Sequence, residues 1–278
     1  SSSSCTGVFT SEMALSVIQK TVNDSKVFQH PVCYRPELRI SMVEKLYGRH
    51  YSITCIYATT DDVGHSGTSR SRVYLVLVHK SMAKMTRDIN QLYSKLAARL
   101  RSMVHTRPSD YMVAEPWEVQ LEVAALAELR AKQNQRANFL KLPIHSLLSP
   151  REQEAIKYSE QLYRSRYGSS PCKDQDLVVH LGDDPRKFLC WSATSRRLPT
   201  RRLSSGRFWH MQSKRFMTSK EQLCSFGLPV TPQCALAMGV PILAVTDPKR
   251  AAHLAGNAMH FSTVSLILFL TLASCRMT

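Results

Sequence analysis

The chain has 278 residues, of which 44% are hydrophobic, so it can bury one large core or two smaller ones. This apolar content argues against wholesale disorder. The formal net charge of +16 favours nucleic acid or another polyanion as the partner. The alternative is a basic, solvated surface that has no such partner.

The cysteines are scattered along the chain and form no C-x-x-C pair. This distribution argues against a zinc ribbon and against a dense disulfide framework, so no metal site is expected. Reduced thiols fit an intracellular location, in the nucleus or an organelle. The apolar run at 264–273 is shorter than the ~20 residues of a membrane-spanning helix. It predicts a buried C-terminal helix, and no membrane partner is expected.

Hydrophobic periodicity predicts the elements of the first 80 residues. Helices are expected at 12–23 and 36–47. Alternation predicts a strand at 51–57, and the polar stretch 61–71 is expected to be a loop. A continuous apolar run at 73–78 predicts a strand of the kind buried in the centre of a parallel or mixed sheet. This order suits the second half of an α/β sheet.

Helical patterns dominate the middle of the chain. Apolar stripes predict helices that begin at Ser81, Pro116 and Pro150, and 168–175 is interpreted as a linker. The expected elements after Pro229 are a helix at 233–238, a short apolar piece at 242–245, a turn at Gly256-Asn257 and the terminal helix.

Residues 185–220, called the basic segment below, hold ten lysines and arginines and no acidic residue. Aromatic side chains are interleaved with these charges, a mixture suited to phosphate contacts and base stacking. One alternative is a solvated surface with ordinary aromatic anchors, and another is that the arginines pair with acidic residues elsewhere in the fold. The candidate nucleic-acid-binding residues are Arg196, Arg197, Arg201, Arg202, Arg207, Trp209, Lys214 and Arg215.

Four short motifs occur in a fixed order around this segment. Thr68-Ser-Arg70-Ser-Arg72 runs directly into the predicted strand at 73–78. After the basic insert come Arg215-x-Met-Thr-x-x-Glu221, Gly227-Leu-Pro and Gly256-Asn257. In this order and spacing, residues 38–275 resemble the C-terminal portion of the DNA cytosine-5 methyltransferase family. Each motif alone is weak, and the order carries the resemblance.

The resemblance implies an α/β fold with three parts. Residues 1–80 would form the second half of a partial class I methyltransferase-like sheet. Residues 81–214 would form a helical, basic target-recognition region, and residues 215–278 would be closing segments that pack back on the sheet as a terminal helix.

The resemblance also implies roles for individual residues. Cys5 would be the attacking nucleophile, Arg70 and Arg72 would lie beside it and the flipped cytosine, and Asn257 would lie beside the methyl donor, S-adenosylmethionine. The alternatives are structural. One arginine would cap the strand and the other would pair with Asp61 or Asp62, and Asn257 would belong to a turn that closes a helix start. The Thr218-x-x-Glu221 spacing is that of a helix capping box.

Several departures from the family pattern predict lost catalysis. No G-x-G donor loop occurs, and His30-Pro31-Val32 stands where the family has Glu-Asn-Val. Ser4 replaces the proline before the nucleophile, and Thr68 replaces the glutamine of the arginine motif. We therefore expect an incomplete or inactive enzyme that does not bind the donor by itself, with DNA favoured over RNA as its partner. The alternatives are a basic assembly subunit of a nucleoprotein complex, such as an organellar ribosome, and one half of a split enzyme whose partner chain carries the donor-binding half.

Overall fold

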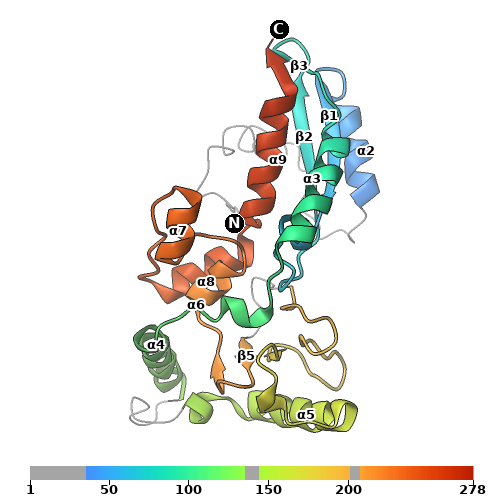
Figure 1. Ribbon diagram of the computed structural model, residues 1–278. Coiled ribbons are helices and arrows are strands. Elements are labelled where there is room, and N and C mark those ends of the chain that lie inside the picture. The colour runs from blue at the N-terminus through green and yellow to red at the C-terminus, as the bar shows by residue number, and fades with distance from the viewer. Residues whose placement is uncertain (1–35, 135–143, 201–206, 278) are drawn as a thin grey trace.

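The computed structural model describes residues 36–134, 144–200 and 207–277. The predicted helix at 12–23 and the residues Cys5, His30, Arg201 and Arg202 lie outside these ranges. The described chain mixes helices with small antiparallel sheets (Figure 1), which agrees with the expected α/β class at this coarse level.

One end of the molecule is built on a two-stranded sheet. Strands β1 (Tyr51–Ala58) and β2 (Arg72–His79) pair antiparallel, in a register that sets Tyr51 opposite His79. Both strands were predicted, because eight-residue β runs give a clear pattern. The prediction that 73–78 is a fully buried central strand is wrong, since within the described chain β2 pairs with β1 alone and most of its residues are half-buried.

Helices cover this sheet. In Figure 1 the strand pair lies between α9 (Phe261–Ser274) and α2 (Pro36–Tyr47), with α3 (Ile89–Met103) alongside. The shared core joins Ile56 and Ala58 of the sheet to residues of α3 and α9. The helix expected from Ser81 begins later, because β3 (Ala83–Met85) intervenes and pairs antiparallel with β7 (Cys275–Met277). The terminal helix is confirmed, but only one face of it is buried.

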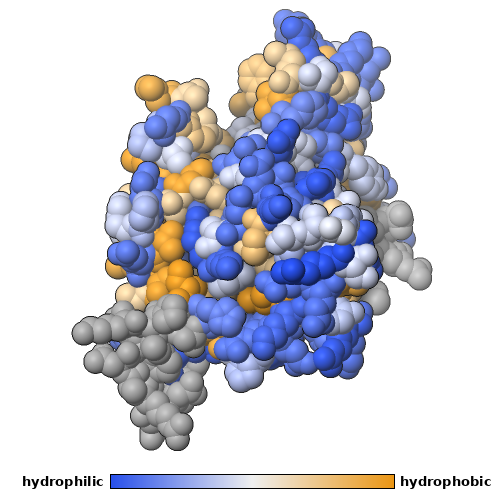
Figure 2. Space-filling view, turned by 60° about the horizontal axis from the view of Figure 1, so that its bottom comes forward, coloured by the Kyte–Doolittle hydropathy of each residue, from blue (hydrophilic) through white to orange (hydrophobic). Residues whose placement is uncertain are grey.

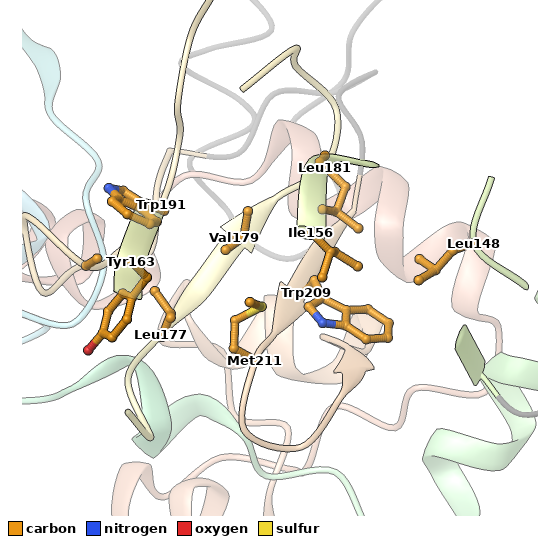
Figure 3. Packing of buried hydrophobic residues seen from close by; sticks show 11 residues of the cluster. Leu148, Ile156, Tyr163, Leu177, Val179, Leu181, Trp191, Trp209 and Met211 are labelled. Carbon is orange, nitrogen blue, oxygen red and sulfur yellow. The ribbon is translucent and has the colours of Figure 1, made fainter. Parts of the chain in front are cut away.

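The opposite end holds a three-stranded antiparallel sheet in the order β4-β5-β6. Its strands are β4 (Val178–His180), β5 (Phe208–His210) and β6 (Arg215–Phe216). The long helix α5 (Pro150–Tyr167) shares its core, and Figure 3 shows the Trp209 ring close to Ile156 and Met211 in that cluster. Strands of two or three residues give no periodicity, so this sheet was not predicted within the helical region.

The expected linker at 168–175 is part of the packed fold. It contains a short 3₁₀ helix, η5 (Pro171–Lys173), and Pro171 is buried. The carboxylate of Asp174 accepts a hydrogen bond of 2.9 Å from the Tyr163 hydroxyl. Composition alone suggested a linker because serine, glycine and proline also form tight 3₁₀ turns.

The remaining elements of the described chain are four helices and three short 3₁₀ turns. They are α4 (Pro116–Asn134), α6 (Ser219–Cys224), α7 (Pro232–Met238) and α8 (Pro248–Asn257), with the 3₁₀ turns η1 (Thr60–Val63), η2 (Pro108–Tyr111) and η4 (Ile144–Leu147). The predicted capping box is confirmed, because Thr218 accepts from the Glu221 amide and Glu221 accepts from the Thr218 amide. The predicted Gly256-Asn257 turn is wrong, since both residues end α8. No helix in the described ranges is long and apolar enough to cross a membrane.

Candidate nucleic-acid interface

The arginine motif before β2 is joined to the basic segment by backbone hydrogen bonds. The Leu198 amide donates to the Gly67 carbonyl at 2.7 Å, and the Ser69 amide donates to the Leu198 carbonyl at 3.0 Å. Thr68 and Leu198 thus form an isolated parallel bridge. Two parts of the chain that the sequence separates widely are therefore held side by side.

Gly67 is required for this arrangement. A Cβ atom at Gly67 would lie 2.5 Å from the carbonyl carbon of Arg107. This overlap is with backbone, which cannot move aside as a flexible side chain could. The hydroxyl of Thr106 accepts a hydrogen bond from the Gly67 amide at 3.0 Å. The absence of a side chain at Gly67 therefore brings the η2 loop against the arginine motif.

The two arginines of the motif lie in different surroundings. Arg70 is 8% exposed, and its guanidinium carbon lies 4.8 Å from the ring centroid of Phe226. Arg72 is half-buried at the start of β2, where it donates to the Ser71 carbonyl at 2.8 Å. Their suggested acidic partners engage other cations, as Arg197 lies 3.2 Å from Asp61 and Arg101 lies 3.6 Å from Asp62.

A polar cleft of about 720 Å³ opens beside the bridge, between η2, η5 and the 195–197 loop. We call it the cleft. Its cations are Arg107, Lys173, Arg196 and Arg197, and its carboxylates are Asp174 and Asp176. Serine and threonine hydroxyls line much of the remainder. Figure 2 shows that much of the face at this end of the molecule is hydrophilic.

Two of these cations are used inside the fold. Arg196 lies 3.0 Å from both carboxylate oxygens of Asp174, and Arg197 lies 3.2 Å from Asp61. These pairs fasten the basic segment to η5 and η1. The alternative that arginines of this segment pair with acidic residues elsewhere is thus observed for Arg196 and Arg197.

The other two cations remain available to a ligand. Arg107 and Lys173 are exposed, and among the residues that the structure describes neither forms an ion pair. Both belong to short 3₁₀ turns or their flanks, started by Pro108 and Pro171. Neither residue can be singled out from the sequence, because isolated cations in loops carry no recognisable pattern.

The remaining candidates of the basic segment are mostly structural. Trp209 is 2% exposed and packs edge-on against Phe216, so it is unavailable for base stacking and that prediction is wrong. Arg215 donates to both oxygens of Glu221, at 2.8 and 2.6 Å. The Arg207 guanidinium lies 5.2 Å from the Phe216 ring centroid, and burial lowers its pKa. Lys214 alone among them is exposed, at a left-handed backbone position with φ 49°.

The structure does not assemble the implied catalytic set within the ranges it describes. Cys5, Arg201 and Arg202 lie outside them, and Asn257 is the last residue of α8. No group of three His, Cys, Asp or Glu residues in the described chain could hold a metal ion. No family model matches this chain, and no curated protein matches it significantly.

Proposed function

We propose that the protein binds nucleic acid, with DNA preferred to RNA, through the cleft. The observation that carries the proposal is the pair of exposed cations, Arg107 and Lys173, that face one polar cleft and are engaged by no carboxylate in the described chain. Lysine and arginine neutralise phosphates and release counterions, which supplies most of the sequence-independent affinity for nucleic acid. The serine and threonine hydroxyls of the cleft are further donors of the kind that contact phosphate oxygens.

The ion pairs of Arg196 and Arg197 are compatible with this role, because each arginine can bind its aspartate and a phosphate at the same time. Both arginine side chains stay accessible in these pairs, with 63% of Arg196 and 38% of Arg197 exposed. A guanidinium has five N–H donors, so it can hold a carboxylate and still offer donors to a phosphate. The ion pairs thereby hold Arg196 and Arg197 in place at the side of the cleft.

We further propose that the chain is a divergent, incomplete or inactive relative of the DNA cytosine-5 methyltransferases. In support, Thr68–Arg72 runs directly into β2, the basic segment returns to it through Leu198, and Thr218 and Glu221 cap α6. S-adenosylmethionine is the donor that the resemblance implies, and this chain alone is not expected to bind it. A basic assembly subunit of a nucleoprotein complex is the alternative, and a preference for structured RNA over DNA would favour it.

Fluorescence anisotropy across a salt series tests the proposal. The probes are a labelled duplex DNA and a structured RNA of similar length. The double variant R107A/K173A removes two positive charges from the cleft. The matched control, K84A/R87A, removes two exposed charges, one in β3 and one just after it, at the other end of the molecule in Figure 1.

The slope of log affinity against log salt should become shallower by about 2 in the cleft variant, since each phosphate contact contributes about −0.9. The control should change it much less. Equal slopes for both variants would show that the positive charge of the whole surface binds nucleic acid. The proposal that the cleft is the binding site would then be wrong.

A further inference from the structure

A second cavity, of about 160 Å³, lies between α4, β6, α6 and α8. Its walls include apolar residues of α4 and β6, among them Val123, Leu126 and Phe216. Apolar side chains gather on the left of the face shown in Figure 2, the side on which α4 lies in Figure 1. The cavity shares no lining residue with the cleft and is smaller than the ~300–1,000 Å³ of drug-sized ligand sites, so it suits a small molecule.

Polar residues line this apolar space as well, and three of them are Glu122, Gln222 and Arg207. Glu122 accepts a hydrogen bond of 2.6 Å from the Ser219 amide through one oxygen. Gln222 is 6% exposed and donates to the Met217 carbonyl at 3.0 Å, while its own Oε1 atom has no hydrogen-bond partner among the described residues. A buried acceptor without a partner is costly, which points to a ligand that donates to it.

The third side chain is Arg207, which lines the cavity from the residue before β5. No ion pair joins Arg207 to Glu122 in the part of the chain that the structure describes. Burial raises the pKa of Glu122 and lowers the pKa of Arg207, so both charges are partly desolvated. Opposite charges that line one cavity without meeting are suited to a ligand that carries both signs.

We propose that this cavity binds a small zwitterion with an apolar body, of the α-amino-acid class. The ammonium group would donate to Glu122 and to Oε1 of Gln222, which are both acceptors. The carboxylate would accept from the Arg207 guanidinium, and the apolar body would pack against the α4 side of the cavity. This assignment is independent of the nucleic-acid proposal, because none of these groups belongs to the cleft.

Three probes of similar shape test the assignment by calorimetry and ligand-observed NMR on the full chain. L-Leucine carries both charges, L-leucinamide lacks the carboxylate, and 4-methylpentanoate lacks the ammonium group. Leucine should bind about tenfold or more tightly than either of the others, since each loses a hydrogen bond to a charged group. Equal binding of all three, or no binding of leucine at millimolar concentration, would overturn the proposal.

Variants separate the roles of the side chains. E122Q keeps an acceptor for the Ser219 amide but removes the charge, so leucine should lose its advantage over 4-methylpentanoate. The matched control is E118Q, one turn earlier on α4, where Glu118 pairs with Lys220 at 2.8 Å and does not line the cavity. Q222M removes the unpartnered oxygen with little change in volume and should also weaken leucine several-fold. Retention of wild-type leucine affinity by both E122Q and Q222M would refute the assignment.

Discussion

The imidazole rings of His65 and His260 meet edge to face, with their centroids 4.5 Å apart, where the η1 loop touches the start of α9. His260 is 1% exposed and caps α9 by accepting from the Thr263 amide. Burial lowers the pKa of His65 to about 4 and lowers that of His260 as well. The contact therefore joins two helical segments through a pair of neutral rings.

This pair predicts an acid-sensitive fold. Since the folded-state pKa values lie below the ordinary 6.5, the unfolded chain binds more protons, so stability should be full above pH 6.5 and fall as the pH drops toward 4. The His65 shift corresponds to at most ~3 kcal/mol. Urea unfolding of H65F between pH 7 and pH 4 should show a shallower decline than the wild type. The exposed residue His50 supplies the control, H50F, and a steeper decline in H65F would contradict this account.

The buried ion pair of Arg215 and Glu221 predicts a large cost for removing one partner. Glu221 is 0% exposed and accepts from two Arg215 nitrogens and from the Thr218 and Ala114 amides. E221Q should lower the free energy of unfolding by roughly 3–5 kcal/mol, because it leaves a buried guanidinium uncompensated.

The exposed pair of Arg186 and Glu154 provides the comparison. Glu154 is 61% exposed, so E154Q should cost less than ~1 kcal/mol in the same denaturation experiment. Similar costs for E154Q and E221Q would mean that burial does not set the strength of these pairs.

The close contact at Gly67 predicts a coupled loss of stability and binding. G67A should destabilise the fold by ~1–3 kcal/mol, because the new methyl group would overlap the Arg107 backbone. The displaced η2 loop carries a cleft cation, so DNA affinity should fall as well. Gly239 has φ 63° and nothing near its Cβ position, and it ends α7, which does not line the cleft. G239A should therefore cost ~1–2 kcal/mol without changing DNA affinity. Unchanged DNA binding by a folded G67A would separate η2 from the cleft.

The ion-paired arginines Arg196 and Arg197 are predicted to contribute little to stability and less than Arg107 and Lys173 to DNA binding. R196A/R197A should lower the melting temperature slightly, since exposed ion pairs contribute about 0–1 kcal/mol each. Its salt slope should change less than that of R107A/K173A, because each lost arginine was already partly neutralised by Asp174 or Asp61. A larger slope change in R196A/R197A would reverse the ranking of these cations.

The chain is also expected not to methylate DNA. No G-x-G occurs in its sequence, and His30-Pro31 stands where the family that it resembles has its catalytic acid. A transfer assay with labelled S-adenosylmethionine and a cytosine-containing duplex should give no more product than the C5A variant. Turnover above that control would disprove the loss of catalysis.

Long regular elements could be predicted from the sequence because their patterns repeat. The strands at Tyr51–Ala58 and Arg72–His79, and the helix that Ser149 caps before Pro150, all follow from local periodicity and capping. The short strands around Trp209 could not be predicted, since their pairing is tertiary. An aromatic residue among arginines resembles a stacking platform in sequence, but this one fills a core.

The candidate site was predicted only in part, for a similar reason. Clustered charge identified the basic segment, yet Arg196 and Arg197 form ion pairs with aspartates from elsewhere in the chain. The available cations, Arg107 and Lys173, come together only when two proline-started turns fold against the arginine motif. Such convergence of separate loops has no signature in a single sequence.

The pairing of β3 with β7 has a practical consequence for surface experiments. Cys275–Met277 lies at the end of the molecule that is farthest from α5 in Figure 1, whereas the cleft lies beside the end of α5. A chip or bead coupled to the β3–β7 end of the molecule would hold the protein by this far end. Long duplexes could then approach the cleft without meeting the support.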